Sequence, residues 1–330
     1  WGVRITRGVA YQSGRVFVNT GDCRLVAIDA ARGKKVWESR VCPADSDYTI
    51  TSAPRVGGGM VFVGPNNEDL GTQRAYVDAY DASSGRRLWR FYTVPGTKGA
   101  PMGVDPDSQH MAAKSWDPDQ LKRAAGGSVW DDITYDEVTG FVYLSAGGTS
   151  PWDPDERGAN RGDELFTNSI IALNAKTGRY VWHYQVTPRD GWNLEPVGPK
   201  VLADVEIDGA KRRVVMDAPK NGFFYVLDAK TGRLLNKPGA FVPVNWAKEI
   251  EFPSGRPVFD PRAEYWKMAE GAMVYPSPSG AHSWLPMSFS PETGLVYIPA
   301  LEHGAKMVQD SSGAAYGGDL RMDYLVGMKD

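Results

Sequence analysis

The side chains that most often carry metals, haem or redox chemistry are few in this chain and far apart. Cys23 and Cys42 are its two cysteines, and no Cys-x-x-Cys-His haem-attachment motif occurs. A metal site needs more partners than these two thiols. They either form one disulfide, if the protein is exported, or remain two inert buried thiols. The histidines share no ligand spacing and are expected to be structural: His110, His183, His282 and His303.

Charge and hydropathy exclude several classes of partner. The chain has 330 residues with 37 basic and 40 acidic side chains, a net charge of −3, which offers no field for nucleic acid or an anionic membrane. No run of about 18 apolar residues occurs, so no membrane span is expected. The chain starts at Trp1 without Met or a signal peptide, so we expect its true start to be missing.

The elements that must position any site are indicated by a phrase that recurs four times. It combines a branched strand, Asp or Asn, Ala, two variable residues, Gly and often a Trp. In three copies the Asp or Asn and the Trp are eight residues apart, and successive copies lie 52, 93 and 54 residues apart. A recurrence of about 50 residues, built from short strands and turns, is typical of a blade array with its ligands near the central axis. The copies are Asp29-Ala30…Gly33…Trp37, Asp81-Ala82…Gly85…Trp89, Asn174-Ala175…Gly178…Trp182 and Asp228-Ala229…Gly232.

We therefore predict an all-β chain, residues 1–330 forming one domain with four full blades and part of a fifth. Two long connections interrupt the array, Pro95–Gly127 and Pro238–Gly280; short helices are expected at 109–114 and 118–125 in the first. Four and a half blades cannot close a ring, so the remaining blades are expected from missing sequence or another chain. The expected blades are residues 8–38, 50–91, 128–184, 200–236 and, incomplete, 284–330.

Several phrases, in order along the chain, resemble the quinoprotein alcohol dehydrogenases. The resemblance implies a periplasmic, eight-bladed β-propeller that holds pyrroloquinoline quinone (PQQ) and a Ca²⁺ or lanthanide ion on its axis. A hard cation would polarise the quinone carbonyl while a carboxylate takes the alcohol proton. The phrases include Tyr48-Thr49-Ile50-Thr51-Ser52-Ala53-Pro54, Ala218-Pro219-Lys220-Asn221-Gly222-Phe223 and Gly280-Ala281-His282-Ser283-Trp284-Leu285-Pro286-Met287.

By this resemblance, five residues outside the family's metal-binding turn are candidates for contact with PQQ. Arg7 would pair with a carboxylate of the cofactor, Thr51 would donate a hydroxyl hydrogen bond, and Trp130 would lie flat beneath the quinone. Lys220 would be the cation near the quinone carbonyls, and Ser283 stands where relatives carry an Asn. The alternatives are structural: a surface Arg, a strand Thr, an interface Trp and a solvated turn Lys.

The metal-binding positions depart from the family pattern. The family's Gly-Gly-Ala-Glu turn appears here as a turn containing Asn67, Glu68 and Asp69. Its spacing to Gly71 favours Asp69 as metal ligand, Glu68 remains possible, and Asn67 is assigned to the cofactor; the alternative is an ordinary acidic turn. The family's second ligand, an Asn, falls on Gly148, which has no side chain to offer.

The base position also departs from the family pattern. The family's catalytic Asp falls on Asn193, and an amide is no base at neutral pH. Glu195, two residues further on, stands where lanthanide-using relatives carry an extra acidic ligand. Glu195 would bind the cation, act as base, or face solvent.

The resemblance thus predicts a PQQ-dependent dehydrogenase that oxidises a primary or secondary alcohol and passes electrons to a carrier such as cytochrome c. The alternative is a catalytically degenerate propeller that binds a ligand or serves as a scaffold, which Asn193 and Gly148 suggest. An outer-membrane assembly factor built from blades is a weaker third hypothesis.

Overall fold

The computed structural model describes residues 6–46, 48–66, 73–123, 126–158 and 162–309, and the backbone of 320–324. Asn67, Glu68, Asp69 and Gly71 lie outside the described residues. Within the described part, no helix has the length and apolar character needed to cross a membrane.

Sixteen consecutive strands form four antiparallel, four-stranded sheets, each strand paired with its neighbour in sequence. Sheet 1 contains β1 (Ala10–Gln12), β2 (Arg15–Thr20), β3 (Arg24–Asp29) and β4 (Lys35–Arg40). Sheet 2 contains β5 (Arg55–Gly57), β6 (Met60–Val63), β7 (Tyr76–Asp81) and β8 (Arg87–Tyr92). Sheet 3 contains β9 (Ile133–Asp136), β10 (Phe141–Ala146), β11 (Ser169–Asn174) and β12 (Tyr180–Gln185). Sheet 4 contains β13 (Val201–Ile207), β14 (Ala210–Asp217), β15 (Phe223–Asp228) and β16 (Gly239–Ala240).

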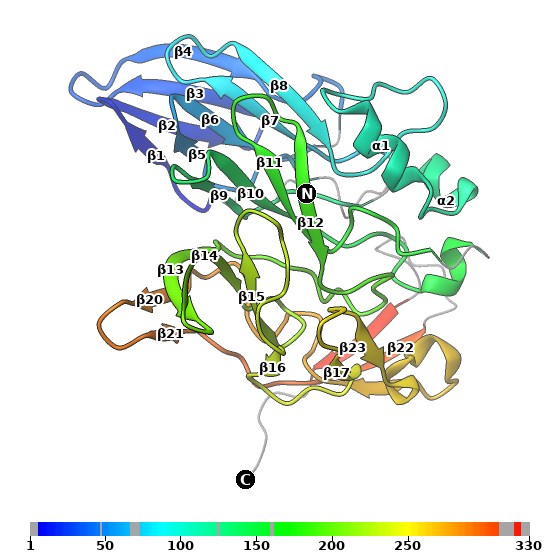
Figure 1. Ribbon diagram of the computed structural model, residues 1–330. Coiled ribbons are helices and arrows are strands. Elements are labelled where there is room, and N and C mark those ends of the chain that lie inside the picture. Colours follow the sequence, from blue (N-terminus) through cyan, green and yellow to red (C-terminus); the bar gives the residue numbers. More distant parts are fainter. Residues whose placement is uncertain are drawn as a thin grey trace.

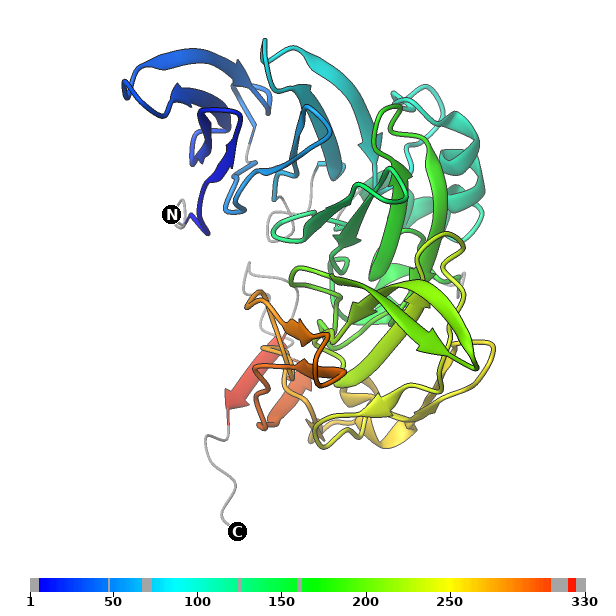
Figure 2. The same ribbon diagram turned by 60° about the vertical axis from the view of Figure 1, so that its left-hand side comes forward.

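The sheets stand side by side in an open arc, as expected for part of a propeller (Figures 1 and 2). The first strands of neighbouring sheets, β1 with β5 and β5 with β9, contact each other. The segments next to these first strands therefore gather on the inner side of the arc. In Figure 2, sheet 1 and the orange and red C-terminal strands form the two ends of the arc.

The recurring phrase forms the joint between neighbouring sheets. The Trp at the end of one copy lies against the glycine turn of the next, and its indole N–H donates to the Ala carbonyl there: Trp37 to Ala82 (3.2 Å), Trp89 to Ala175 (2.8 Å) and Trp182 to Ala229 (3.0 Å). A Cβ on the glycine of each of these turns would lie 2.5–2.6 Å from the indole, at Gly85, Gly178 and Gly232. Glycine is required there because the ring occupies the space of a side chain.

The connections contain more structure than the sequence predicts. The first holds α1 (Pro106–Ala113) and α2 (Pro118–Arg123), as expected, and η1 (Pro154–Arg157) lies between β10 and β11. In the second connection, from Pro238 to Gly280, strands and 3₁₀ turns occupy much of the chain. The fourth strand of sheet 4 is β16, which lies beyond residue 236, the expected end of that blade, whereas Leu234 makes an isolated bridge to Leu227. The second connection contains β17 (Ala247–Ile250), β18 (Pro257–Phe259), η2 (Pro261–Ala263), η3 (Tyr265–Lys267) and β19 (Ala272–Val274).

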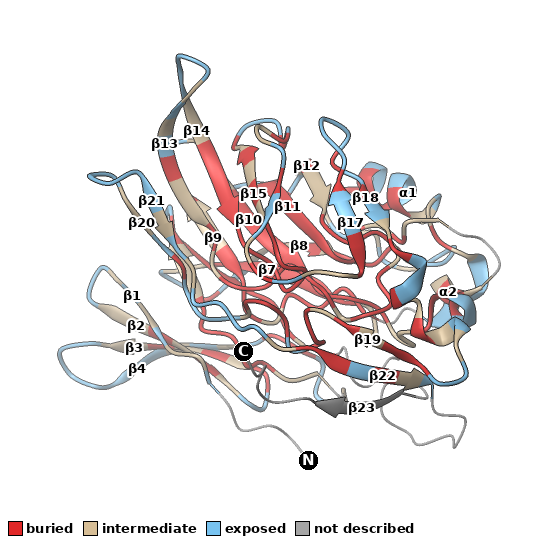
Figure 3. Ribbon diagram, turned by 90° about the horizontal axis from the view of Figure 1, so that it is seen from below, coloured by how far each residue is buried: buried red, intermediate tan, exposed pale blue. Residues whose placement is uncertain are grey.

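The C-terminal strands form smaller sheets. The hairpin of β20 (Ser288–Ser290) and β21 (Leu295–Tyr297) stands beside β13, and β19 pairs with β22 (Ala305–Gln309), which pairs with β23 (Leu320–Tyr324). Burial is greatest in the middle of the arc, in sheets 2 to 4, whereas strand β4 of sheet 1 is largely exposed (Figure 3). Cys23 and Cys42 form a disulfide, which decides between the two states that the sequence left open.

Candidate active site at the inner side of the arc

Two cationic side chains approach one half-buried indole. The guanidinium carbon of Arg7 lies 4.7 Å from the ring centroid of Trp130, and Nζ of Lys220 lies 5.9 Å from it. Arg7 is also 5.5 Å from the ring of Trp284, so it lies close to two indoles. Two cationic groups beside one aromatic face suit a flat ligand that carries negative charge.

Segments outside the β ladders bring these residues together. Arg7 precedes β1, and its backbone N–H donates to the carbonyl of Thr51, which precedes β5 (3.1 Å). The Thr51 hydroxyl donates to the carbonyl of Trp130, which precedes β9 (3.4 Å). Lys220 follows β14. The site is thus built where successive sheets approach each other at the inner side of the arc.

Glu195 is the carboxylate beside Lys220. It is 2% exposed, and its Oε1 lies 2.7 Å from Nζ of Lys220 while its Oε2 accepts the backbone N–H of Gly148 at 3.0 Å. The solvent-facing alternative for Glu195 is therefore wrong. Gly148, which offers no side-chain ligand, instead holds this carboxylate through its N–H.

Asn193 lies in a tight turn whose conformation is stabilised by the carboxylate of Asp190. Its φ of +62° is in the left-handed region, which Asn tolerates better than most residues, and its amide donates to Pro278 O at 3.4 Å. The carboxylate of Asp190 accepts the N–H groups of Trp192 (2.8 Å) and Leu194 (2.7 Å). Burial raises the pKa of Asp190 to about 6.

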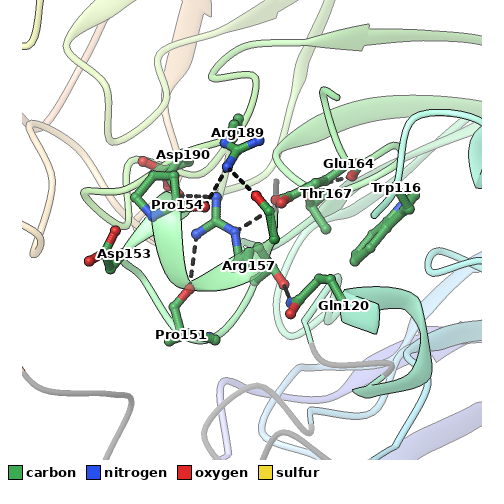
Figure 4. A network of polar contacts seen from close by, with 12 residues as sticks. Trp116, Gln120, Pro151, Asp153, Pro154, Arg157, Glu164, Thr167, Arg189 and Asp190 are labelled. Carbon is green, nitrogen blue, oxygen red and sulfur yellow. Dashed lines mark hydrogen bonds and ion pairs between the residues drawn. The ribbon is translucent and has the colours of Figure 1, made fainter. Parts of the chain in front are cut away.

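A buried arginine supports this turn from the side of η1 (Figure 4). Arg157 is 1% exposed and donates to the carboxylate of Glu164 (3.0 Å) and to the Asp190 carbonyl (3.0 Å). It also donates to the carbonyls of Pro151 (2.9 Å) and Trp152 (2.8 Å). These four bonds join the loop before β11 to the turn that carries Asn193 and Glu195.

The guanidinium of Arg7 fits a carboxylated ligand. Atoms Nε and Nη1 of Arg7 are buried and have no hydrogen-bond partner in the described part of the protein, and neither oxygen of Asp131 has one. Asp131 lies 3.9 Å from Arg7, and burial, reinforced by Asp132, raises its pKa to about 6. A buried guanidinium with unused donors binds a carboxylate well, so Arg7 fits the acidic part of PQQ.

The fit to a metal ion is partial. Among the described residues, no group of three or more His, Cys, Asp or Glu side chains is arranged to hold a metal. Glu195 carries carboxylate oxygens of the type that a hard cation binds, and the acidic turn with Glu68 and Asp69 lies outside the described residues.

Of the candidate site residues that the structure describes, it brings most together. Arg7, Thr51, Trp130, Lys220 and Glu195 form one connected group, and half-buried Ser283 lies between His282 and Trp284. Sequence reasoning missed Trp284 and Asp131 as neighbours of Arg7. Both could have been found from the sequence, because each directly follows a candidate site residue.

Comparisons with known proteins agree with a propeller fold. Residues 2–238 match the family model "PQQ: Glucose/ethanol/alcohol dehydrogenase, beta-propeller domain". The quinohemoprotein alcohol dehydrogenase ADH-IIG of Pseudomonas putida is 47% identical over 300 residues, which are 90% of this chain and 41% of that protein. Lupanine 17-hydroxylase [cytochrome c] of a Pseudomonas species is 42% identical over 332 residues, 100% of this chain and 46% of that protein.

Solved structures show the same relationship. The ADHIIG structure from P. putida HK5 superposes with a TM-score of 0.89 at 43% identity, covering 97% of this chain and 48% of that one. A europium-containing methanol dehydrogenase superposes with a TM-score of 0.84 at 30% identity, covering 96% and 56%. The chain belongs to the PQQ-dependent alcohol dehydrogenase β-propeller family. It spans about half the length of the curated relatives it matches.

Proposed function

We propose that the protein is a PQQ-dependent dehydrogenase that oxidises a primary or secondary alcohol to the carbonyl compound. The observation that carries this proposal is the convergence of Arg7 and Lys220 on Trp130. A flat, polycarboxylated quinone complements that arrangement in shape and charge. When bound, PQQ supplies the electrophilic carbonyl that accepts hydride.

Each residue has a stated task in this proposal. Trp130 supports one face of the ring system, Arg7 pairs with a carboxylate, and Lys220 places an ammonium near the quinone oxygens. Thr51 and Ser283 offer hydroxyl groups, and Asn67 completes the set of cofactor contacts. Glu68, Asp69 and Glu195 are the proposed ligands of a Ca²⁺ or lanthanide ion.

Glu195 is also the proposed base, in place of the amide of Asn193. It is buried, its carboxylate is held by Lys220 and the Gly148 N–H, and it lies on the same turn as Asn193. A carboxylate two residues further along can accept the substrate proton that an amide cannot. Asn193 then orients the substrate through its amide.

The wider setting is part of the same proposal. We propose a periplasmic protein that passes electrons to an external carrier such as cytochrome c, which is part of the name of the lupanine relative. Further blades would complete the ring. Support comes from the turn at Gly33: no atom of the described part lies within 4 Å of a Cβ placed there, whereas the equivalent turns of the other copies hold a Trp.

The test is reconstitution of the complete protein with PQQ and either Ca²⁺ or a lanthanide, followed by dye reduction with a panel of alcohols. Glu195→Gln should lower turnover by about 10²- to 10⁴-fold, the usual cost of losing a positioned base. Glu206→Gln, at an exposed glutamate of β13, is the matched control and should change little. Failure to bind PQQ with either metal would defeat the proposal.

The variant Asn193→Asp separates an altered site from a degenerate one. If Glu195 acts as the base, the wild type is active and Asn193→Asp raises its turnover rate little. A wild type that binds PQQ without turnover, and becomes active as Asn193→Asp, would instead show that the base was lost. The comparisons favour the active enzyme, because the relatives are named as dehydrogenases and a hydroxylase.

A further inference from the structure

Four charged side chains lie buried together behind the candidate site. Nζ of Lys200 lies 2.5 Å from Oδ2 of Asp132 and 3.1 Å from Oδ2 of Asp217, and it donates to the Gly198 carbonyl at 3.1 Å. His282, the fourth member, is fully buried. The exposed fractions of Lys200, Asp132 and Asp217 are 5%, 1% and 1%.

The two ring nitrogens of His282 both face backbone carbonyls. Nδ1 lies 2.5 Å from the oxygen of Ala218, and Nε2 lies 2.7 Å from that of Leu285. Because a carbonyl oxygen only accepts, both contacts are hydrogen bonds when both nitrogens carry a proton, which makes the ring cationic. The cluster then holds two cations and two carboxylates and is electrically balanced.

Lys200 is the member that joins the two carboxylates. Burial disfavours its ammonium, yet its pKa is raised because Asp132 and Asp217 outweigh that effect. Burial raises the pKa of Asp217, against the pull of Lys200 and His282. Without Lys200, two buried carboxylates would share one cation, which is a costly arrangement.

Three members of the cluster lie close in sequence to a residue that is a candidate for contact with the cofactor. Asp132 follows Trp130 by two residues, Asp217 precedes Lys220 by three, and His282 is adjacent to Ser283. Trp130, Lys220 and Ser283 all lie outside the strands, so no β ladder fixes their positions. The buried charges hold these three segments in place where no strand pairing does so.

We propose that the Lys200–Asp132–Asp217–His282 cluster is a positioning device that holds Trp130, Lys220 and Ser283 in the arrangement that binds the cofactor. This inference rests on the proposed function for the identity of the ligand. These four residues act through their neighbours in sequence and do not touch the cofactor themselves. Lys200 is thus a positioning residue, distinct from the residues of the site.

The test compares three variants of the complete protein. Lys200→Met removes the charge at similar length, and Lys200→Met combined with Asp217→Asn restores the balance between Asp132 and His282. Lys211→Met is the matched control, since Lys211 is exposed and lies in β14, the strand that also contains Asp217. The affinity for PQQ is measured by quenching of tryptophan fluorescence.

We expect Lys200→Met to weaken PQQ binding by about 10- to 100-fold, as removal of supporting partners does at other preorganised sites. The paired variant should recover most of that loss, and Lys211→Met should bind like the wild type. A folded Lys200→Met that binds PQQ normally would overturn the inference. If Lys200→Met does not fold, the paired variant decides: folding without PQQ binding would overturn the inference as well.

A readout without cofactor separates this inference from the proposed function. The emission that Trp130→Phe removes from the wild-type spectrum reports the surroundings of Trp130. This emission should shift in Lys200→Met, return in the paired variant and stay unchanged in Lys211→Met; an unshifted emission in Lys200→Met would count against positioning. If the wild type does not bind PQQ, the proposed function fails, and the emission still decides whether the cluster positions Trp130.

Discussion

The ammonium of Lys220 lies 2.7 Å from Oε1 of Glu195, and both side chains are buried. One residue was expected to touch the cofactor and the other to bind a metal or act as base. Their contact couples the two halves of the candidate site, so a change at either should affect both.

Lys220→Met should therefore destabilise the fold as well as weaken PQQ binding. Removing one partner leaves the other as an uncompensated buried charge, which costs about 3–5 kcal/mol. Urea unfolding measures this cost, with Lys230→Met, at an exposed turn lysine, as the control. Adding Glu195→Gln should restore much of the stability but not the PQQ affinity. Equal stability of Lys220→Met and wild type would contradict the pairing.

Arg157→Met should lower the free energy of unfolding by a similar amount, about 3–5 kcal/mol, because Glu164 and several carbonyls lose their buried donor. The effect should reach the turn with Asn193 and Glu195, so turnover falls further than PQQ affinity does. Chemical denaturation and PQQ titration test both statements, with Arg233→Met as the exposed control. A variant as stable as wild type would show that the network in Figure 4 contributes little.

Asp131 should make stability depend on pH in a definite direction. Its pKa rises from 3.8 to about 6 on folding, so between these values the folded state binds more protons than the unfolded state. The contribution of Asp131 to stability is present at low pH and is lost as the pH rises through about 6.

The matching experiment compares unfolding of wild type and Asp131→Asn over this range. The free energy of unfolding of the variant, relative to that of the wild type, should increase by up to about 3 kcal/mol as the pH rises from about 4 to about 7, because Asn carries no buried charge. Asp190, whose pKa is also about 6, remains in both proteins and cancels in the difference. A difference that does not vary with pH would refute the assignment.

The disulfide of Cys23 and Cys42 should stabilise sheet 1. It closes a loop with a sequence separation of 19 residues, for which the chain-entropy model gives about 3 kcal/mol. The variant Cys23→Ser/Cys42→Ser should unfold at lower urea concentration, and reductant should do the same to the wild type. Reductant should have no effect on the double variant, which is the control.

The sheets were predictable because their signals are local. Each copy of the phrase carries its own turn and strands, and the resemblance correctly brought Arg7, Trp130 and Lys220 to one place. The strands between Pro238 and Gly280 were missed because prolines and short lengths hide their alternation.

The partners of buried charges were not predictable in the same way. Glu195 with Lys220 and Asp132 with Lys200 are separated by many residues, and neither pair has a spacing rule that a sequence could display. For this reason the sequence alone could not exclude that Glu195 faces solvent. Only the packing of sheets 3 and 4 decides which charges meet.

The joint between an indole and the glycine turn of the next sheet makes the arc modular. Trp89 and Gly178 join sheets 2 and 3 in addition to the buried hydrophobic side chains that these two sheets share, and each sheet depends chiefly on its immediate neighbours. Gly148 and Asn193 lie outside these joints and outside the strands, so the joints do not constrain either residue directly.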